Sequence, residues 1–369
     1  MSWLQWQSLN RLGRASFRTL VRFPFVLLMA SGFTGISLYW VTYDFTERAE
    51  WLASRGIMTF VLGLTLMLST TLFGERYCKN RVQQVGLNLV GILGLVLYFE
   101  TLPGYSLLGV YHHFVLLAAG THLLVSFAPY VFTREIDGFW QYNKTLFIRI
   151  LTAVLYTTVI YIGLTICLTT MQYLFLVDIS SATYSRLWII IVGIFNTWFF
   201  LAGIPEDWDA LQKSDEYPSG LKMFTQYVLV PLITVYFMIL ILYTLKILVQ
   251  WQLPKGLVGY LVSGYSVCGL LSILLIFPVQ DQRENRWISI FGRMFYYGLL
   301  PLLVLLWVAI YIRIDAYGVT VNRYLLTVLS VWLSLITVYY LVTNSRNIKV
   351  IPGTLCLLIF TVSFGPWGA

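Results

Sequence analysis

Eleven long apolar stretches, joined by short polar loops, constrain the fold of this 369-residue chain more than any other feature. A helix that crosses about 30 Å of hydrocarbon needs roughly 20 apolar residues, and most of the stretches are close to that length. Strands of a membrane barrel would alternate polar and apolar residues, which these stretches do not. With 59% hydrophobic and 11% charged residues, the chain is unlike a soluble domain. The sequence predicts an all-α, polytopic helical membrane bundle of about eleven transmembrane helices.

The predicted domain boundaries follow from these stretches. Residues 1–22 are expected to form a cytoplasmic amphipathic basic helix, and residues 23–369 the transmembrane helical domain. The fifth span is longer than a bilayer requires and should tilt or project beyond the headgroups, whereas the eleventh is short. The predicted spans are, in order, 23–43, 57–73, 85–99, 107–132, 146–175, 187–204, 223–249, 257–279, 288–312, 324–342 and 350–364.

The positions of the lysines and arginines predict the orientation of the bundle. With the N-terminus in the cytoplasm, 17 of the 24 Lys and Arg residues lie in cytoplasmic segments and the other 7 lie outside. That bias is typical of a multi-pass inner-membrane protein, and eleven spans then place the C-terminus outside the cytoplasm. The net charge of +8 is spread over loops that flank the spans, and no continuous basic domain is present. A nucleic-acid-binding function is therefore excluded.

The N-terminal arm has the pattern of an amphipathic helix with one basic face. Residues 1–43 contain no Asp or Glu, and Pro24 is placed to let the chain turn from the interface into the bilayer. The expected partner of the arm is the anionic headgroup layer of the bilayer. A cleaved signal peptide is the rival interpretation, although the first span ends without a small-x-small cleavage pattern; a simple positive-inside anchor is the other. The basic face holds Arg11, Arg14, Arg18 and Arg22, and the opposite face holds Trp6, Leu9, Phe17 and Leu20.

Polar residues inside the spans are the first candidates for function, because they are costly in hydrocarbon unless they are paired or hydrated. The candidates are His122, Asn88 and Asn196. His122 is expected to be neutral and hydrogen-bonded to a neighbouring helix, with a proton-linked role as the alternative. Both asparagines are interpreted as helix–helix contacts. His113 and His122 are nine residues apart and face opposite sides of a helix, and the four cysteines match no zinc or disulfide pattern, so no metal or other cofactor is expected.

The second group of candidates lies at the cytoplasmic boundary of the membrane. Aromatic and basic residues before the fifth span have the composition of an interfacial anchor, and the loop after the sixth span is rich in carboxylates. No nucleotide-binding loop, nucleophile elbow or zinc-protease motif is present, so the sequence gives no reason to expect an enzyme. The boundary candidates are Trp140, Asn143, Lys144, Arg149 and Glu206.

Several of these segments together resemble a family of bacterial multi-pass membrane proteins that is catalogued only as a domain of unknown function. The resemblance covers nearly the whole chain, and it implies no catalytic or binding residues. Longer members of the family continue into a more polar region, so this chain resembles the membrane domain. The segments that carry the resemblance are Phe139-Trp140-Gln141-Tyr142-Asn143-Lys144, Phe199-Phe200-Leu201-Ala202-Gly203-Ile204-Pro205-Glu206, Leu253-Pro254-Lys255-Gly256, Tyr317-Gly318-Val319-Thr320-Val321-Asn322-Arg323-Tyr324 and Phe364-Gly365-Pro366-Trp367-Gly368-Ala369.

Two classes of function follow from the sequence. The favoured class is a structural or assembly module that anchors a partner or a C-terminal region, because few polar groups lie in the spans. The alternative is a transporter or permease-like protein for a small solute. That alternative is supported by His122, by the prolines Pro231 and Pro301 inside spans, and by the similarity of residues 227–232 to residues 297–302.

The first prediction concerns topology. Reporter fusions after Lys79 and Asp215 should report a cytoplasmic location, and fusions after Glu47 and Asp315 an extracytoplasmic one, because the basic residues favour that orientation. A paired phosphatase and fluorescent-protein reporter at each site measures this. The inverse pattern at all four sites would overturn the orientation.

Overall fold

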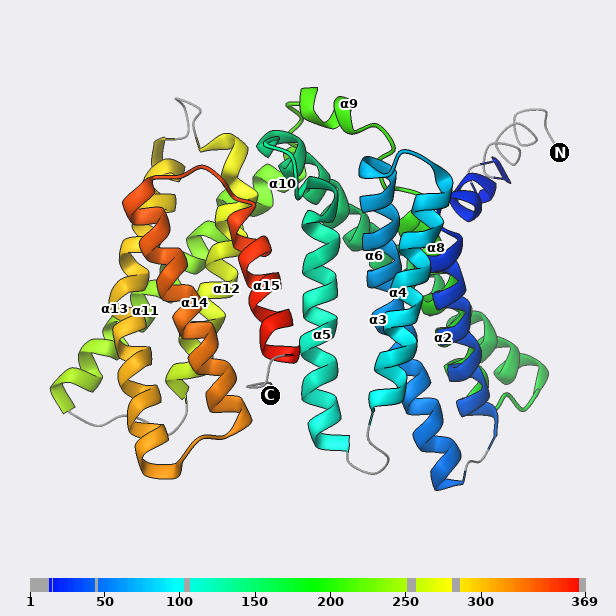
Figure 1. The fold of residues 1–369 in the computed structure, drawn as a ribbon. Helices are drawn as coiled ribbons and strands as arrows, with labels where there is room; N and C mark the ends of the chain where they lie inside the picture. The colour runs from blue at the N-terminus through cyan, green and yellow to red at the C-terminus, as the bar shows by residue number, and fades with distance from the viewer. Residues whose placement is uncertain are drawn as a thin grey trace. The chain divides into compact units, whose positions relative to one another are not determined.

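The computed structural model describes residues 13–14, 16–43, 46–102, 107–250, 257–280 and 286–364, with residues 107–109 and 286 described by their backbone alone. Within these residues the regular structure is entirely helical (Figure 1). Residues 1–12 and 15 lie outside the described part. They include Trp6, Leu9 and Arg11 of the predicted basic helix. Residues 13–14 and 16–22 are helical, with Arg14 and Arg18 exposed.

The helices follow one another with short connections. They are α2 (Pro24–Thr42), α3 (Glu47–Tyr77), α4 (Arg81–Thr101), α5 (Leu107–Phe127), η1 (Ala128–Tyr130), α6 (Ile136–Phe175), α7 (Ser181–Ile190), η2 (Ile191–Asn196), α8 (Thr197–Leu201), α9 (Trp208–Lys213), α10 (Ser219–Met223), η3 (Phe224–Leu229), α11 (Val230–Gln250), α12 (Leu257–Ile276), η4 (Phe277–Val279), α13 (Arg286–Tyr317), α14 (Val321–Thr343) and α15 (Val350–Phe364).

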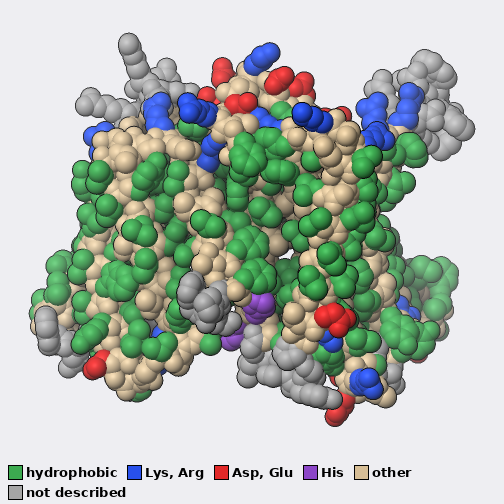
Figure 2. All heavy atoms as spheres, in the orientation of Figure 1, with side chains coloured by type: hydrophobic (Ala, Val, Ile, Leu, Met, Phe, Trp, Pro, Cys, Tyr) green, Lys and Arg blue, Asp and Glu red, His purple; other side chains and the backbone are tan. Residues whose placement is uncertain are grey.

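Ten of the eleven predicted spans correspond to helices that are long and apolar enough to cross a membrane, counted over the described residues. The eleventh is α15, which has 15 residues. At about 1.5 Å per residue it is roughly 22 Å long, shorter than the hydrocarbon layer. Large apolar side chains such as Val90 and Val304 are exposed, and Figure 2 shows that charged side chains gather at the helix ends. This distribution suits a multi-pass membrane protein.

The chain divides into two compact units. Unit 1 comprises Met1–Arg134, Tyr142–Trp208 and Ile359–Gly365, and unit 2 comprises Glu135–Gln141, Asp209–Leu358 and Pro366–Ala369. Helices α6 and α15 therefore contribute residues to both units. No such division was expected from the sequence, which reads as one continuous series of spans.

Unit 1 is built around α3, which packs against α2, α4 and α5. Glycines allow these helices to approach closely. A Cβ atom at Gly63 would lie 2.6 Å from the sulfur of Met29 on α2, and one at Gly91 on α4 would lie 2.6 Å from the terminal methyl of Met67. Small residues at such contacts are typical of membrane helices, because close backbone approach increases van der Waals packing.

Unit 2 has a core formed by α11, α12, α13 and α14. Aromatic rings make up much of that core. The rings of Tyr265 and Phe295 have centroids 5.5 Å apart, and those of Tyr296 and Tyr340 are stacked at 5.0 Å. Such pairs stabilise a core beyond the burial of their area.

Two spans are interrupted by π-helical turns. The turn η2 separates α7 from α8, and η3 leads into α11, where Pro231 is the second residue. By contrast, Pro301 lies inside α13 and is preceded by α-helical residues. The stretches around these two prolines resemble each other in sequence, yet their backbones differ. A π turn is rare and is often retained at a functional position.

Candidate functional site

Arg22 lies at a break between two helical segments of unit 1. The helical residues 16–22 end at Arg22, Phe23 has φ −122° and ψ 47°, and Pro24 begins α2. Proline suits the first position of a helix because its missing N–H has no intrahelical acceptor there. The predicted change of direction at Pro24 is thus accompanied by a backbone break at Phe23.

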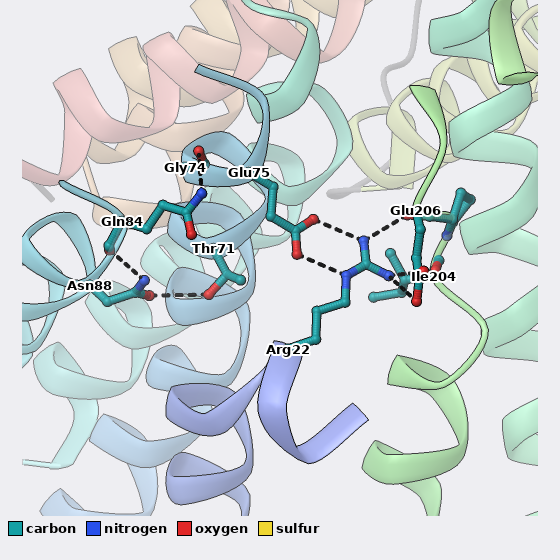
Figure 3. A network of polar contacts seen from close by, with 9 residues as sticks. Arg22, Thr71, Gly74, Glu75, Gln84, Asn88, Ile204 and Glu206 are labelled. Carbon is teal, nitrogen blue, oxygen red and sulfur yellow. Dashed lines mark hydrogen bonds and ion pairs between the residues drawn. The ribbon is translucent and has the colours of Figure 1, made fainter. Parts of the chain in front are cut away.

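The guanidinium of Arg22 binds a carboxylate and two backbone carbonyls. Nε and Nη2 donate to the two carboxylate oxygens of Glu75, each at 2.8 Å. Nη1 donates to the carbonyl of Ile204 at 2.8 Å, and Nη2 also donates to that of Pro205 at 2.7 Å (Figure 3). We call Arg22, Glu75, Ile204 and Pro205 the Arg22 cluster.

The Arg22 cluster is largely shielded from solvent. The side chains of Arg22 and Glu75 are 14% and 23% exposed. A two-point arginine–carboxylate contact at this depth is stronger than an exposed ion pair, because it fixes geometry and is less screened. Glu206 contributes less, since its carboxylate is 3.9 Å from Nη1 and its side chain is 68% exposed. The cluster joins three segments of unit 1 that are far apart in sequence.

A second polar network connects the same end of α3 to α4. The Asn88 amide nitrogen donates to the carbonyl of Gln84 at 2.9 Å, and the Gln84 amide donates to that of Gly74, the neighbour of Glu75, at 3.3 Å. The Asn88 oxygen accepts from Thr70 at 2.8 Å and from Thr71 at 3.2 Å, as Figure 3 shows in part. Asn88 is 4% exposed. The interhelical contact expected from the sequence is present.

An aromatic cluster lies next to Glu75 along the chain. The guanidinium of Arg76 is 4.3 Å from the ring centroid of Tyr130 and 5.4 Å from that of Trp208. The ring centroid of Tyr142 lies 5.7 Å from that of each of these two rings. The Tyr142 hydroxyl donates to the carbonyl of Val125 at 2.9 Å. Because the charge lies over ring faces, the π electrons of the two rings stabilise it.

The predicted boundary residues are divided between the two units. Asn143 in unit 1 donates to the carbonyl of Ser126 at 3.1 Å and accepts from its hydroxyl at 2.6 Å. Lys144 is 9% exposed, whereas Arg149 is exposed and its side chain packs against Gly203.

Trp140 belongs to unit 2 and packs against other residues of that unit. It is 4% exposed, donates to the carbonyl of Leu274 at 2.7 Å and stacks on Tyr217 at 5.5 Å. The interpretation of Trp140 as an anchor in the lipid interface is therefore wrong, since its ring is enclosed by protein. Burial also raises the pKa of Tyr217, so its hydroxyl stays protonated and donates to the carbonyl of Leu275 at 3.2 Å.

His122 was expected to form a hydrogen bond with a neighbouring helix, and this expectation is also wrong. His122 is exposed, and its Nδ1 lies 2.7 Å from the carbonyl of Ala118, one turn earlier on the same helix. The 3.6-residue period specifies the face of a helix on which a residue lies but not which neighbour covers that face. Asn196, at the end of η2, accepts from Thr157 of α6 at 3.1 Å and makes the interhelical contact that was expected.

The Arg22 cluster was the main feature that the sequence did not reveal. Arg22 was assigned to a headgroup-binding face together with three other arginines, and the structure directs it to Glu75 instead. A signal was present, because Glu75 is the only carboxylate between Glu50 and Glu100 and lies among basic residues. Among the described residues, no group of three or more His, Cys, Asp or Glu could hold a metal ion. The arrangement binds segments of the chain to one another.

The second prediction tests the Arg22 cluster. Arg22→Gln should lower the free energy of unfolding by about 2–3 kcal/mol, because Glu75 and two carbonyls lose their donor while partly buried. Thermal unfolding of the purified protein in neutral detergent measures the change. Arg18→Gln is the matched control, since Arg18 is exposed and belongs to the same helical segment; it should change stability by less than about 0.5 kcal/mol. Equal effects of the two variants would contradict the assignment.

Comparison with known proteins places the chain in a family. An uncharacterized protein, PM1469, of Pasteurella multocida is 26% identical over 328 residues, which cover 85% of this chain and 53% of that protein. The chain thus spans about half the length of this curated relative. No solved structure matches. The family model described as "Domain of unknown function (DUF4153)" matches residues 25–369. The chain therefore belongs to the DUF4153 family.

Proposed function

We propose that this chain is a membrane-anchoring module that holds a partner or an additional protein region at the cytoplasmic ends of its helices. The observation that supports this most directly is the pairing of the buried hydroxyls in the spans. Each of six such groups donates to the carbonyl four residues earlier in its own helix, and these are Thr34, Ser69, Thr121, Ser266, Ser272 and Thr337. Hydroxyls bonded in this way are not directed toward a solute.

The part of the loop between α8 and α10 that belongs to unit 2, residues 209–216, is the proposed attachment surface. Residues 209–216 contain three carboxylates, and Figure 2 shows acidic side chains gathered over α9. Within unit 1, the Arg22 cluster fixes the start of this loop at Ile204 and Pro205. An acidic segment favours a partner with a basic surface, because complementary charge raises the rate and specificity of association.

The length of the Pasteurella relative supports the same proposal. About half of that protein lies outside the matched stretch, while the family model covers almost all of this chain. In such a longer protein, a membrane module of this kind would anchor the additional region.

A transporter is the second candidate, and one observation favours it. Gln226 lies in the π-helical turn η3 and is 3% exposed, and its amide nitrogen has no hydrogen-bond partner among the described residues. An unpaired buried amide is costly, so such a group suits a polar solute that binds transiently.

The third prediction separates the two functions. A photo-crosslinking residue at Asp209 or Asp215, both exposed in the loop, should give a discrete adduct in native membranes. The same residue at Tyr311, exposed on α13, should give none with protein. Proteoliposomes of the purified chain should be no more permeable to small solutes than empty vesicles.

Two results would overturn the anchoring proposal. One is the absence of any adduct at both loop positions. The other is a saturable solute flux that Gln226→Leu abolishes while the folded protein is retained, and this second result would assign transport instead.

A further inference from the structure

Unit 2 contains a cavity of about 750 Å³ between α12, α13 and α14. It lies where α13 ends at Tyr317 and α14 begins at Val321, so one end of it is at the helix termini. Its described lining residues extend along α13 from Arg313 back to Leu306, about 10 Å deeper. The cavity is therefore long enough to hold both a headgroup and part of an apolar chain.

Two arginines give the outer part of this cavity a positive charge. Arg313 and Arg323 both line it, and no carboxylate does so among the described residues. Their guanidinium carbons lie 5.8 Å and 5.5 Å from the ring centroid of Tyr317. Neither arginine forms an ion pair with a described carboxylate. Two like charges gathered near one ring repel each other, and a bound anion would relieve that repulsion.

The turn between α13 and α14 holds one of these charges in place. Gly318 has a φ of +72°, a conformation that glycine adopts without strain. Nη1 of Arg323 donates to the carbonyl of Tyr317 at 3.0 Å and to that of Gly318 at 2.6 Å. These bonds satisfy carbonyls at the end of α13, and they engage only one of the three guanidinium nitrogens. The remaining donors of Arg323 are available to a ligand.

The polar groups around the arginines add to the preference for an anion. Helix α14 has 23 residues, and its first turn, with Asn322, lines the cavity. The partial positive charge at a helix N-terminus favours negative groups. On α12, the hydroxyl of Ser263 is buried and has no hydrogen-bond partner among the described residues, although it lines the same cavity. A buried hydroxyl without a partner is costly unless a ligand accepts from it.

The deeper wall is apolar. Leu306, Ile310, Leu326 and Leu329 line it, and Leu306 and Ile310 belong to the buried core of unit 2. We propose that this cavity binds an anionic phospholipid, with the phosphate between Arg313 and Arg323 and an acyl chain along the apolar wall. An arginine pair above an apolar surface matches the two halves of such a molecule.

Binding of tail-labelled phosphatidylglycerol to the purified chain in neutral detergent tests this proposal, with phosphatidylcholine as the uncharged comparison. The chain should prefer phosphatidylglycerol, and Arg313→Gln should weaken its binding about tenfold, because a charge-assisted contact is lost. Arg293→Gln is the matched control: it removes the same charge from an exposed position on the same helix, outside the cavity, and should leave binding unchanged.

Ser263→Ala provides a second readout that does not depend on charge. It removes a hydroxyl without a described partner, so the unliganded protein should be as stable as the original, whereas phosphatidylglycerol should bind more weakly. Equal affinity for the two lipids would overturn the proposal, as would equal losses from Arg313→Gln and Arg293→Gln. If glycerol phosphate at the same concentration as the lipid fully displaced phosphatidylglycerol, the site would be assigned to a soluble organophosphate instead.

Discussion

Inside hydrocarbon, every backbone N–H and C=O must find its partner within the protein, and the rest of this structure depends on that requirement. Helices meet it by themselves, so the spans need no polar partners along most of their length. Partners from elsewhere in the protein are needed where a helix ends, because its last carbonyls have no intrahelical donor. Helix α8 ends at Leu201, and the guanidinium of Arg22 supplies donors to the carbonyls of Ile204 and Pro205 just beyond it. Arg323 does the same for the end of α13.

The position of most spans could be predicted from the sequence, because crossing a bilayer is a condition on length and composition alone. The lengths were less accurate. Helix α3 extends from Glu47 to Tyr77, whereas only 57–73 was predicted, since charged residues at both ends continue the helix beyond the apolar stretch. Helix α6 begins at Ile136 for the same reason. The length of an apolar stretch is set by the thickness of the hydrocarbon layer, whereas the helix itself can extend beyond that layer.

The candidate sites were harder to predict, because they depend on contacts between segments far apart in the chain. Arg22 and Glu75 are 53 residues apart, and Arg22 and Ile204 are 182 apart. Helical periodicity assigned Arg22 to a face but carried no information about what lies opposite. The contact of Asn88 was easier to predict, since a buried amide between adjacent spans has few possible hydrogen-bond partners other than a neighbouring helix. Arg313 and Arg323 were counted as indicators of topology, and Arg323 also lies in a segment that carries the family resemblance. Neither use indicated a site, although the structure places both beside one cavity.

The two kinds of acceptor in the Arg22 cluster also impose an order on its assembly during synthesis. Chains emerge from the ribosome N-terminus first, so Glu75 becomes available to Arg22 long before Ile204 and Pro205 are made. Four helical spans separate the two events in the described chain: α4, α5, α6 and the span that ends with α8. The ion pair can join the first two spans early, and the carbonyls can be added only after the sixth span has entered the membrane. The cluster therefore closes in two stages, and its second stage marks the completion of the sixth span.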